Sequence, residues 1–404
     1  MSTTTRDYIS RAVFSREGID RFLDPNAHNW GTFDATLGYV RQPSIQQNGV
    51  DRSFTVRRDG PLGERLMLNY PDRPCRINTY GNSFTQCDQV SDGETWQEYL
   101  AAHIGEPVRN FGVGGYGVYQ AYRRMLREEA TDASAEYVIL NVWSDDHYRS
   151  IYSWRLLHMP GYGEMLRDTA SVSDSGYMFH TNPWVHLRMN LDTGEFEEHE
   201  NRYPTPESLY QLCDADHIVE AFKDDVEVQA RLAMQGATDV QIGLLQRFAD
   251  ALGLTTDFSS SETTARTGDA LLTAYALRST MVVVERAREF AASSGKELMV
   301  LLSFMSSDVS NACHGRPRFD QPFVDYLEER EFLFVDSLRK HVEDYSQFRC
   351  TPEEYAARQY IGHYAPTGNH FFAFAVKDEV VDWLDPKPPA YRFENPPRPA
   401  ELLQ

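Results

Sequence analysis

Short apolar runs alternate with helical patterns in two separate parts of the chain. The strand-like runs, rich in β-branched and aromatic residues, lie at 74–80, 107–111, 136–142, 297–304 and 331–335. Helical patterns lie at 94–104, 117–130, 270–294, 321–329, 336–344 and 366–384. Strands separated by helices of this length are typical of a parallel sheet. The pattern predicts an α/β fold: a doubly wound, flavodoxin-like, mostly parallel sheet with helices on both faces.

This pattern also divides the chain. Residues 1–72 are rich in Gly, Pro and Asn with short alternating runs, and we expect a partly β N-terminal cap. The α/β core is expected over 73–150 and 269–384. The intervening insertion, 151–268, holds a predicted hairpin near Asp192-Thr193-Gly194, a helical pattern over 216–252 and a Ser/Thr-rich linker at 255–267. An insertion of this length beside the sheet is expected to form a lid or a substrate wall. Residues 385–404 form a Pro-rich arm, expected to extend along the surface or onto a neighbouring subunit, which leaves a homo-oligomer open.

Composition narrows the classes of partner. Lys and Arg number 39 against 60 Asp and Glu, a formal net charge of −21, which repels nucleic-acid backbones and anionic membrane surfaces. The longest apolar runs are too short to cross a bilayer, and Met1–Ala12 lacks the apolar core of a signal peptide, so a cytoplasmic location is expected. The five cysteines are scattered without C-x-x-C spacing, so neither a disulfide framework nor a zinc site is predicted. We expect no cofactor.

Four short motifs fall where predicted strands end or helices begin. Gly81-Asn82-Ser83-Phe84-Thr85 follows the first core strand and leaves Ser83 at the carboxyl edge of the sheet, where open α/β sheets bind their ligands. Asn110-Phe111-Gly112-Val113-Gly114-Gly115 follows the second strand, and glycines let backbone N–H groups approach a ligand closely. Trp143-Ser144-Asp145-Asp146 follows the third strand. Gly362-His363-Tyr364-Ala365-Pro366 opens the last helix, where proline suits the first turn.

Taken in order, these motifs resemble those of the SGNH/GDSL hydrolase superfamily. Gly-Asn-Ser-Phe-Thr resembles the family's Gly-Asp-Ser-x-Thr nucleophile block, and Gly362-His363 before Pro366-x-Gly368 resembles its C-terminal histidine block. The resemblance covers roughly 73–150 and 290–384. It implies Ser83 as nucleophile, His363 as general base, and the N–H groups of Ser83 and Gly115 as oxyanion donors. Residue chemistry agrees, because serine needs a base to remove its proton and imidazole titrates near neutrality.

Two positions depart from the family pattern. The third block normally reads Gly-x-Asn-Asp, and here Asp145 stands where that asparagine would donate to the oxyanion. An ionised carboxylate about 4 Å from an oxyanion costs roughly 4 kcal/mol at a surface-like dielectric, so Asp145 is protonated, turned aside or in another role. The family also carries an aspartate three residues before the histidine, and here that position is Tyr360. His363 then acts in a dyad or borrows a carboxylate; the candidates are Asp145, Asp308, Glu353 and Glu354.

The leading hypothesis is a serine hydrolase that cleaves an ester, such as an O-acyl group on a carbohydrate or another polar small molecule. A second hypothesis keeps the fold but uses Asp145 as general acid or base on a glycosidic bond or another non-ester substrate. A third is a degenerate binding module. Further candidates for the site are Asn82, Asp146, Trp143 as a stacking surface, and Arg155 as an anion clamp. We expect no metal at Asp145-Asp146-His147, since neighbours on a strand point to opposite faces.

Overall fold

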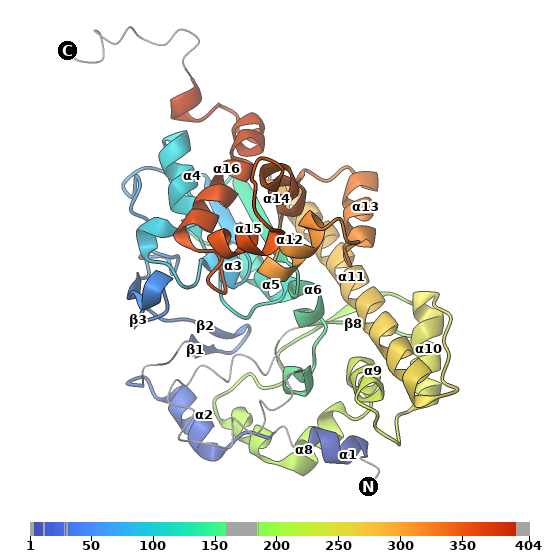
Figure 1. Ribbon diagram of the computed structural model, residues 1–404. Coiled ribbons are helices and arrows are strands. Elements are labelled where there is room, and N and C mark those ends of the chain that lie inside the picture. Colours follow the sequence, from blue (N-terminus) through green and yellow to red (C-terminus); the bar gives the residue numbers. More distant parts are fainter. Residues whose placement is uncertain are drawn as a thin grey trace, which may run out of the picture.

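The computed structural model describes residues 4–10, 13–27, 29, 31–158, 184 and 186–392. A five-stranded sheet lies in the upper body of the molecule (Figure 1). Its strands are β5 (Ile77–Tyr80), β6 (Arg109–Asn110), β7 (Tyr137–Trp143), β10 (Glu297–Ser303) and β11 (Phe334–Asp336). They lie in the order β11-β10-β7-β5-β6, and all neighbouring pairs are parallel. In sheet numbering this is the 2-1-3-4-5 order of a doubly wound sheet, which confirms the predicted α/β fold.

Helices cover both faces of this sheet. One layer contains α5 (Val118–Glu128) and α11 (Ser261–Ser293), which pack on each other and on the strands. The other contains α4 (Trp96–Ile104), α14 (Ser337–Tyr345) and α16 (Pro366–Trp383). The shorter helices around them are α12 (Ser306–Cys313), α13 (Gln321–Glu329) and α15 (Pro352–Gln359). Because both faces are covered, nearly every residue of β7 is buried, which explains its continuous apolar run.

The N-terminal elements pack on two regions, the hairpins beside the loops at the carboxyl edge of the sheet and the helices on the insertion. They are the helices α1 (Thr5–Ile9) and α2 (Arg16–Leu23), a hairpin of β1 (Gly31–Asp34) and β2 (Gly38–Arg41), and a second hairpin of β3 (Ser44–Gln46) and β4 (Thr55–Arg57). The Tyr39 hydroxyl donates to the Gly114 carbonyl at 2.8 Å. The first hairpin is therefore anchored to the glycine-rich loop that follows β6.

The described part of the insertion contains a hairpin and several short helices. The predicted hairpin is present as β8 (His186–Met189) and β9 (Phe196–His199), and its turn places Gly194 at a φ of 73°. The predicted helix over 216–252 is divided into α8 (Ala215–Phe222), α9 (Val226–Met234) and α10 (Ile242–Leu252). The break before α9 has a local cause, because the Asp225 carboxylate caps it by accepting from Glu227 N–H at 2.9 Å. Residues 159–183 and 185 of the insertion lie outside the described residues.

The predicted linker at 255–267 is wrong over its second half. Ser260 and Thr263 form a capping box, so α11 begins at Ser261 rather than near 270 and runs for 33 residues. Its first turns pack against α9, and its later turns reach the sheet, so one helix connects the insertion to the core (Figure 1). Of the predicted Pro-rich arm, only 385–392 lies within the described residues, and there the Asp385 N–H donates to the Tyr137 hydroxyl at 2.9 Å.

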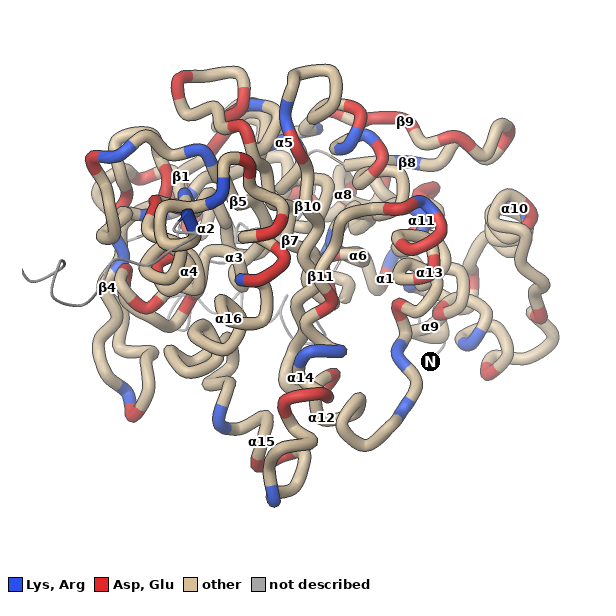
Figure 2. Tube along the Cα trace, turned by 90° about the horizontal axis from the view of Figure 1, so that it is seen from above, with Lys and Arg blue, Asp and Glu red and all other residues tan. Residues whose placement is uncertain are grey.

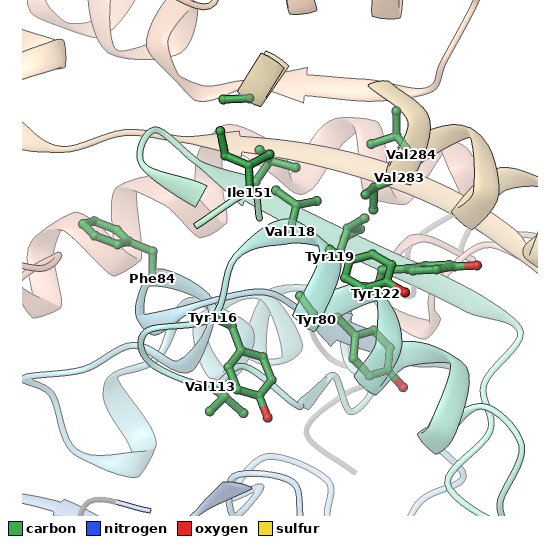
Figure 3. Close-up of a cluster of buried hydrophobic side chains, with 14 of the residues drawn as sticks. Tyr80, Phe84, Val113, Tyr116, Val118, Tyr119, Tyr122, Ile151, Val283 and Val284 are labelled. Carbon is green, nitrogen blue, oxygen red and sulfur yellow. The ribbon is translucent and has the colours of Figure 1, made fainter. Parts of the chain in front are cut away.

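The core extends from the sheet edge to α11. Figure 3 shows side chains of β5, the glycine-rich loop, α5 and α11 gathered in one cluster, among them Tyr80, Tyr116, Tyr119 and Val283. Acidic and basic positions are interspersed around the outside of the fold, so the charge of −21 is spread over the surface (Figure 2). Among the described residues, no helix is both long and apolar enough to cross a membrane.

Candidate active site

Ser83 lies at the point where the chain order of the sheet reverses, between β5 and β7. β5 ends at Tyr80, and α3 (Ser83–Gln86) is a single turn that begins at Ser83 itself. The Asn82 side chain caps this turn by accepting from Phe84 N–H at 2.7 Å. Gly81 allows the tight entry, since a Cβ there would lie 2.7 Å from the Asn141 carbonyl oxygen of β7. The serine is thus held at the position where doubly wound sheets bind ligands.

The glycine-rich loop packs directly on α3. Val113 N–H donates to the Gly81 carbonyl at 3.0 Å, and Gly114 N–H donates to the Gln86 side chain. Within the described part of the chain, neither Ser83 N–H nor Gly115 N–H donates to a protein acceptor. These are the two N–H groups that the family resemblance implies as oxyanion donors, and within the described residues no protein acceptor occupies either of them.

The end of β7 is tied to the nucleophile turn through Asp146. Its buried carboxylate accepts from the Asn82 amide at 2.8 Å and from Trp143 N–H at 3.0 Å. Arg149 lies 3.3 Å from the same carboxylate. Burial raises the pKa of Asp146 to about 7, and Arg149 and the two N–H donors act against that rise. Asn82 therefore has two roles, since its oxygen caps α3 and its amide holds the third motif in place.

This double contact explains why asparagine, rather than the aspartate of the resembling family, suits position 82. Replacing Asn82 with Asp is expected to keep the helix cap. It would also place a second carboxylate beside that of Asp146, in place of the amide donor. The loss of unfolding free energy should grow with pH, reaching roughly 2 kcal/mol or more at pH 8.5, because both groups are then driven to ionise. Urea unfolding at pH 5.5 and 8.5 measures it. Asn82→Ala is the control: its loss should also grow with pH, because the Asp146 carboxylate loses a donor, but by much less than in Asn82→Asp, which adds a second carboxylate. Equal pH dependence of the two variants would contradict the explanation.

Asp145 does not lie free at the sheet edge. Its carboxylate accepts from Arg149 Nε at 2.8 Å and lies 3.9 Å from Arg155 Nη2. Arg155 is buried, and its Nη1 donates to the Gly115 carbonyl at 3.3 Å. Of the three alternatives for Asp145, the structure supports a side chain turned aside into an ion pair with Arg149.

The residues after Asp145 form a helix rather than the continued strand assumed in the sequence analysis. α6 (Asp146–Arg149) begins directly there, and His147 is buried with its Nδ1 at 2.9 Å from the Thr280 hydroxyl. Among the described residues, no three His, Cys, Asp or Glu side chains are grouped so that they could hold a metal ion.

Phe84 is the meeting point of the distant motifs. Its ring centroid lies 4.8 Å from that of Trp143 and 5.0 Å from that of His363. The Arg149 guanidinium lies 4.8 Å from the Trp143 ring, so Trp143 packs between Phe84 and Arg149 instead of presenting a free stacking surface. The Ser83 and His363 segments are thus neighbours across Phe84, and no hydrogen bond joins the two side chains among the described residues. Catalytic hydrogen bonds are often long before substrate binds.

His363 is supported by an amide and not by a carboxylate. Gln89 Oε1 lies 2.8 Å from the His363 backbone nitrogen and 2.9 Å from its ring Nδ1. Tyr360, at the family's aspartate position, points elsewhere, because its hydroxyl donates to the Phe304 carbonyl at 3.0 Å.

None of the predicted carboxylate partners bonds to His363 within the described residues. Asp145 pairs with Arg149, Glu353 accepts from Ser310, and Glu354 caps its own helix at Thr351. Asp308 is placed beside Ser144, whose hydrogen bond acts against the rise that burial causes in the Asp308 pKa. The sequence does not single out Gln89, because the family pattern predicts an acid at this place; its one local signal is its position six residues after Ser83.

Comparisons with known proteins add no assignment. No protein family model matches the chain, and a search of curated proteins finds no similar sequence.

Proposed function

We propose that the protein is a serine hydrolase of the SGNH type that cleaves an ester. The single observation that carries the proposal is the convergence at Phe84 of the Ser83 turn with His363, two segments that lie 280 positions apart in the chain. The N–H groups of Ser83 and Gly115, which donate to no acceptor among the described residues, support it, because acyl transfer develops a negative oxygen that such donors stabilise.

The proposed reaction has two halves. Ser83 Oγ bonds to the ester carbonyl carbon while its proton passes to His363 Nε2, and the N–H groups of Ser83 and Gly115 donate to the carbonyl oxygen. The tetrahedral intermediate expels the alcohol, which takes the proton from His363. Water then attacks the acyl-enzyme and gives a proton to His363. The second tetrahedral intermediate releases the acid as Ser83 Oγ takes that proton back from His363, which restores the free enzyme.

The Asp145 alternative has less support. A general acid must present a proton to the leaving group, and the Asp145 carboxylate is engaged by Arg149. The substrate class remains the prediction made from sequence: an O-acyl group on a carbohydrate or another polar small molecule, met in the cytoplasm.

Fluorophosphonate labelling tests the proposal, since these reagents phosphonylate an activated serine. Peptide mapping of the wild type should place the adduct on Ser83, and Ser83→Ala should remain unlabelled. Ser144→Ala is the matched control, because Ser144 is a buried serine at the same sheet edge and its loss should leave labelling intact. An unlabelled wild type, or a Ser83→Ala variant that is still labelled, would overturn the assignment and favour the binding module.

A further inference from the structure

We propose that Gln89 is the positioning residue of the catalytic histidine, so that an amide oxygen does the work usually given to an aspartate. The inference rests on the proposed function for its chemical meaning. Its geometry stands independently, on two short contacts between Gln89 Oε1 and His363.

These two contacts fix the tautomer of His363. A backbone N–H can only donate, so the Gln89 atom that faces His363 N at 2.8 Å must be the amide oxygen. An amide oxygen can only accept, so the ring nitrogen Nδ1, at 2.9 Å from the same oxygen, must carry the proton. In a neutral imidazole the other nitrogen, Nε2, then holds the lone pair. This is the tautomer that can take a proton from Ser83.

The fold holds the Gln89 amide in one orientation. Its Nε2 donates to the Asn48 carbonyl at 3.2 Å, in the loop between β3 and β4, which turns the oxygen toward His363. Gly362 makes the approach possible, since a Cβ at that position would lie 2.7 Å from Gln89 Oε1. The Gln89 side chain therefore connects three segments: the β3–β4 hairpin, the residues that follow α3, and the loop that carries His363.

The backbone around Gln89 has an unusual conformation. Cys87 and Gln89 both have positive φ, at 59° and 68°, and neither is glycine. Such conformations are costly for ordinary residues and persist where the surrounding structure enforces them, often at functional sites. Here they end α3 after one turn and bring Gln89 back toward the histidine.

The charges around His363 differ from those of a Ser-His-Asp triad. Burial lowers the pKa of His363, and Arg149 and Arg41 add to that effect, while Asp88 opposes it. Gln89 is neutral, so it orients the ring without stabilising the imidazolium as a carboxylate would. The base form of His363 should consequently persist to lower pH than an unperturbed histidine, and the acid limb of kcat/KM should lie below pH 6.5.

Two substitutions separate positioning from packing. Gln89→Met keeps the length of the side chain but removes the acceptor, and it should lower kcat on p-nitrophenyl acetate by about 100-fold or more. Gln89→Glu restores an acceptor and adds a charge, so it should keep activity within about tenfold and move the acid limb of kcat/KM upward by about one pH unit. Equal losses in both variants with an unmoved acid limb would show that Gln89 only packs.

A second readout works without turnover. In Ser83→Ala protein labelled with ¹⁵N-histidine, NMR should show His363 protonated at Nδ1, and adding Gln89→Met should produce a mixture of tautomers. Gln97→Met is the matched control, because Gln97 is a buried glutamine whose amide donates to Thr79 and Thr85 rather than to His363. A His363 that stays Nδ1-protonated in Gln89→Met would overturn the positioning role. If only the ester hydrolase proposal is wrong, fluorophosphonate will not label Ser83 in the wild type, while the His363 tautomer will still be as expected.

Discussion

Alanine at Ser83, alanine at His363 and both changes together are expected to leave the same residual ester hydrolysis. Each single change should lower kcat on p-nitrophenyl acetate by on the order of 10⁴-fold or more, because the hydroxyl is a poor nucleophile without its base and the base has no role without the nucleophile. The double variant should lose no more than the worse single variant. Steady-state kinetics of the three proteins against wild type measures this.

His370→Ala is the control for this comparison. His370 lies on α16 as an exposed side chain whose ring centroid is 5.3 Å from that of Tyr99, away from the Ser83 turn. Its loss should change kcat less than twofold. Losses at Ser83 and His363 that multiply in the double variant would mean that the two residues act independently, and the proposed pairing would then be wrong.

Replacing Gly112 with alanine is expected to have the largest effect on folding among the site loops. A Cβ at this position would lie 2.2 Å from Gln86 N and 2.6 Å from the Thr85 carbonyl carbon, both backbone atoms of α3. Backbone has no rotamer with which to move away, so α3 and the glycine-rich loop must separate. We expect a loss of roughly 3 kcal/mol in unfolding free energy, together with slower fluorophosphonate labelling, because Ser83 begins the displaced helix.

Gly243→Ala is the matched control for Gly112→Ala. Gly243 lies in the first turn of α10, and a Cβ there meets nothing within 4 Å. Urea unfolding should show no loss, or a gain of up to about 1 kcal/mol, because alanine favours helix over glycine. A Gly112→Ala protein as stable as Gly243→Ala would mean that the loop and α3 are not held in close contact.

The placement of core strands and helices could be predicted because their signals are local. A buried strand such as β7 is a short run of apolar residues, and a helix such as α13 repeats its apolar positions every three to four residues. The predicted start of α11 is wrong because a tertiary contact, which the local composition does not reveal, helps to stabilise its first turns. The Ser/Thr-rich composition around Ser260 indicated a linker, whereas a capping box and packing against α9 stabilise a helix there.

The features of the candidate site also separate into those set by local sequence and those set by long-range contacts. Sequence alone determined the parallel sheet and the position of Ser83 after β5, because chain periodicity and turn chemistry act between residues a few positions apart. Only the tertiary structure decided which group supports His363, since its contact with Gln89 spans 274 positions and depends on two left-handed residues, Cys87 and Gln89, that no local pattern specifies. The same holds for Asp145, whose carboxylate turns to Arg149 because α6 begins one residue later and places the guanidinium one helical turn away.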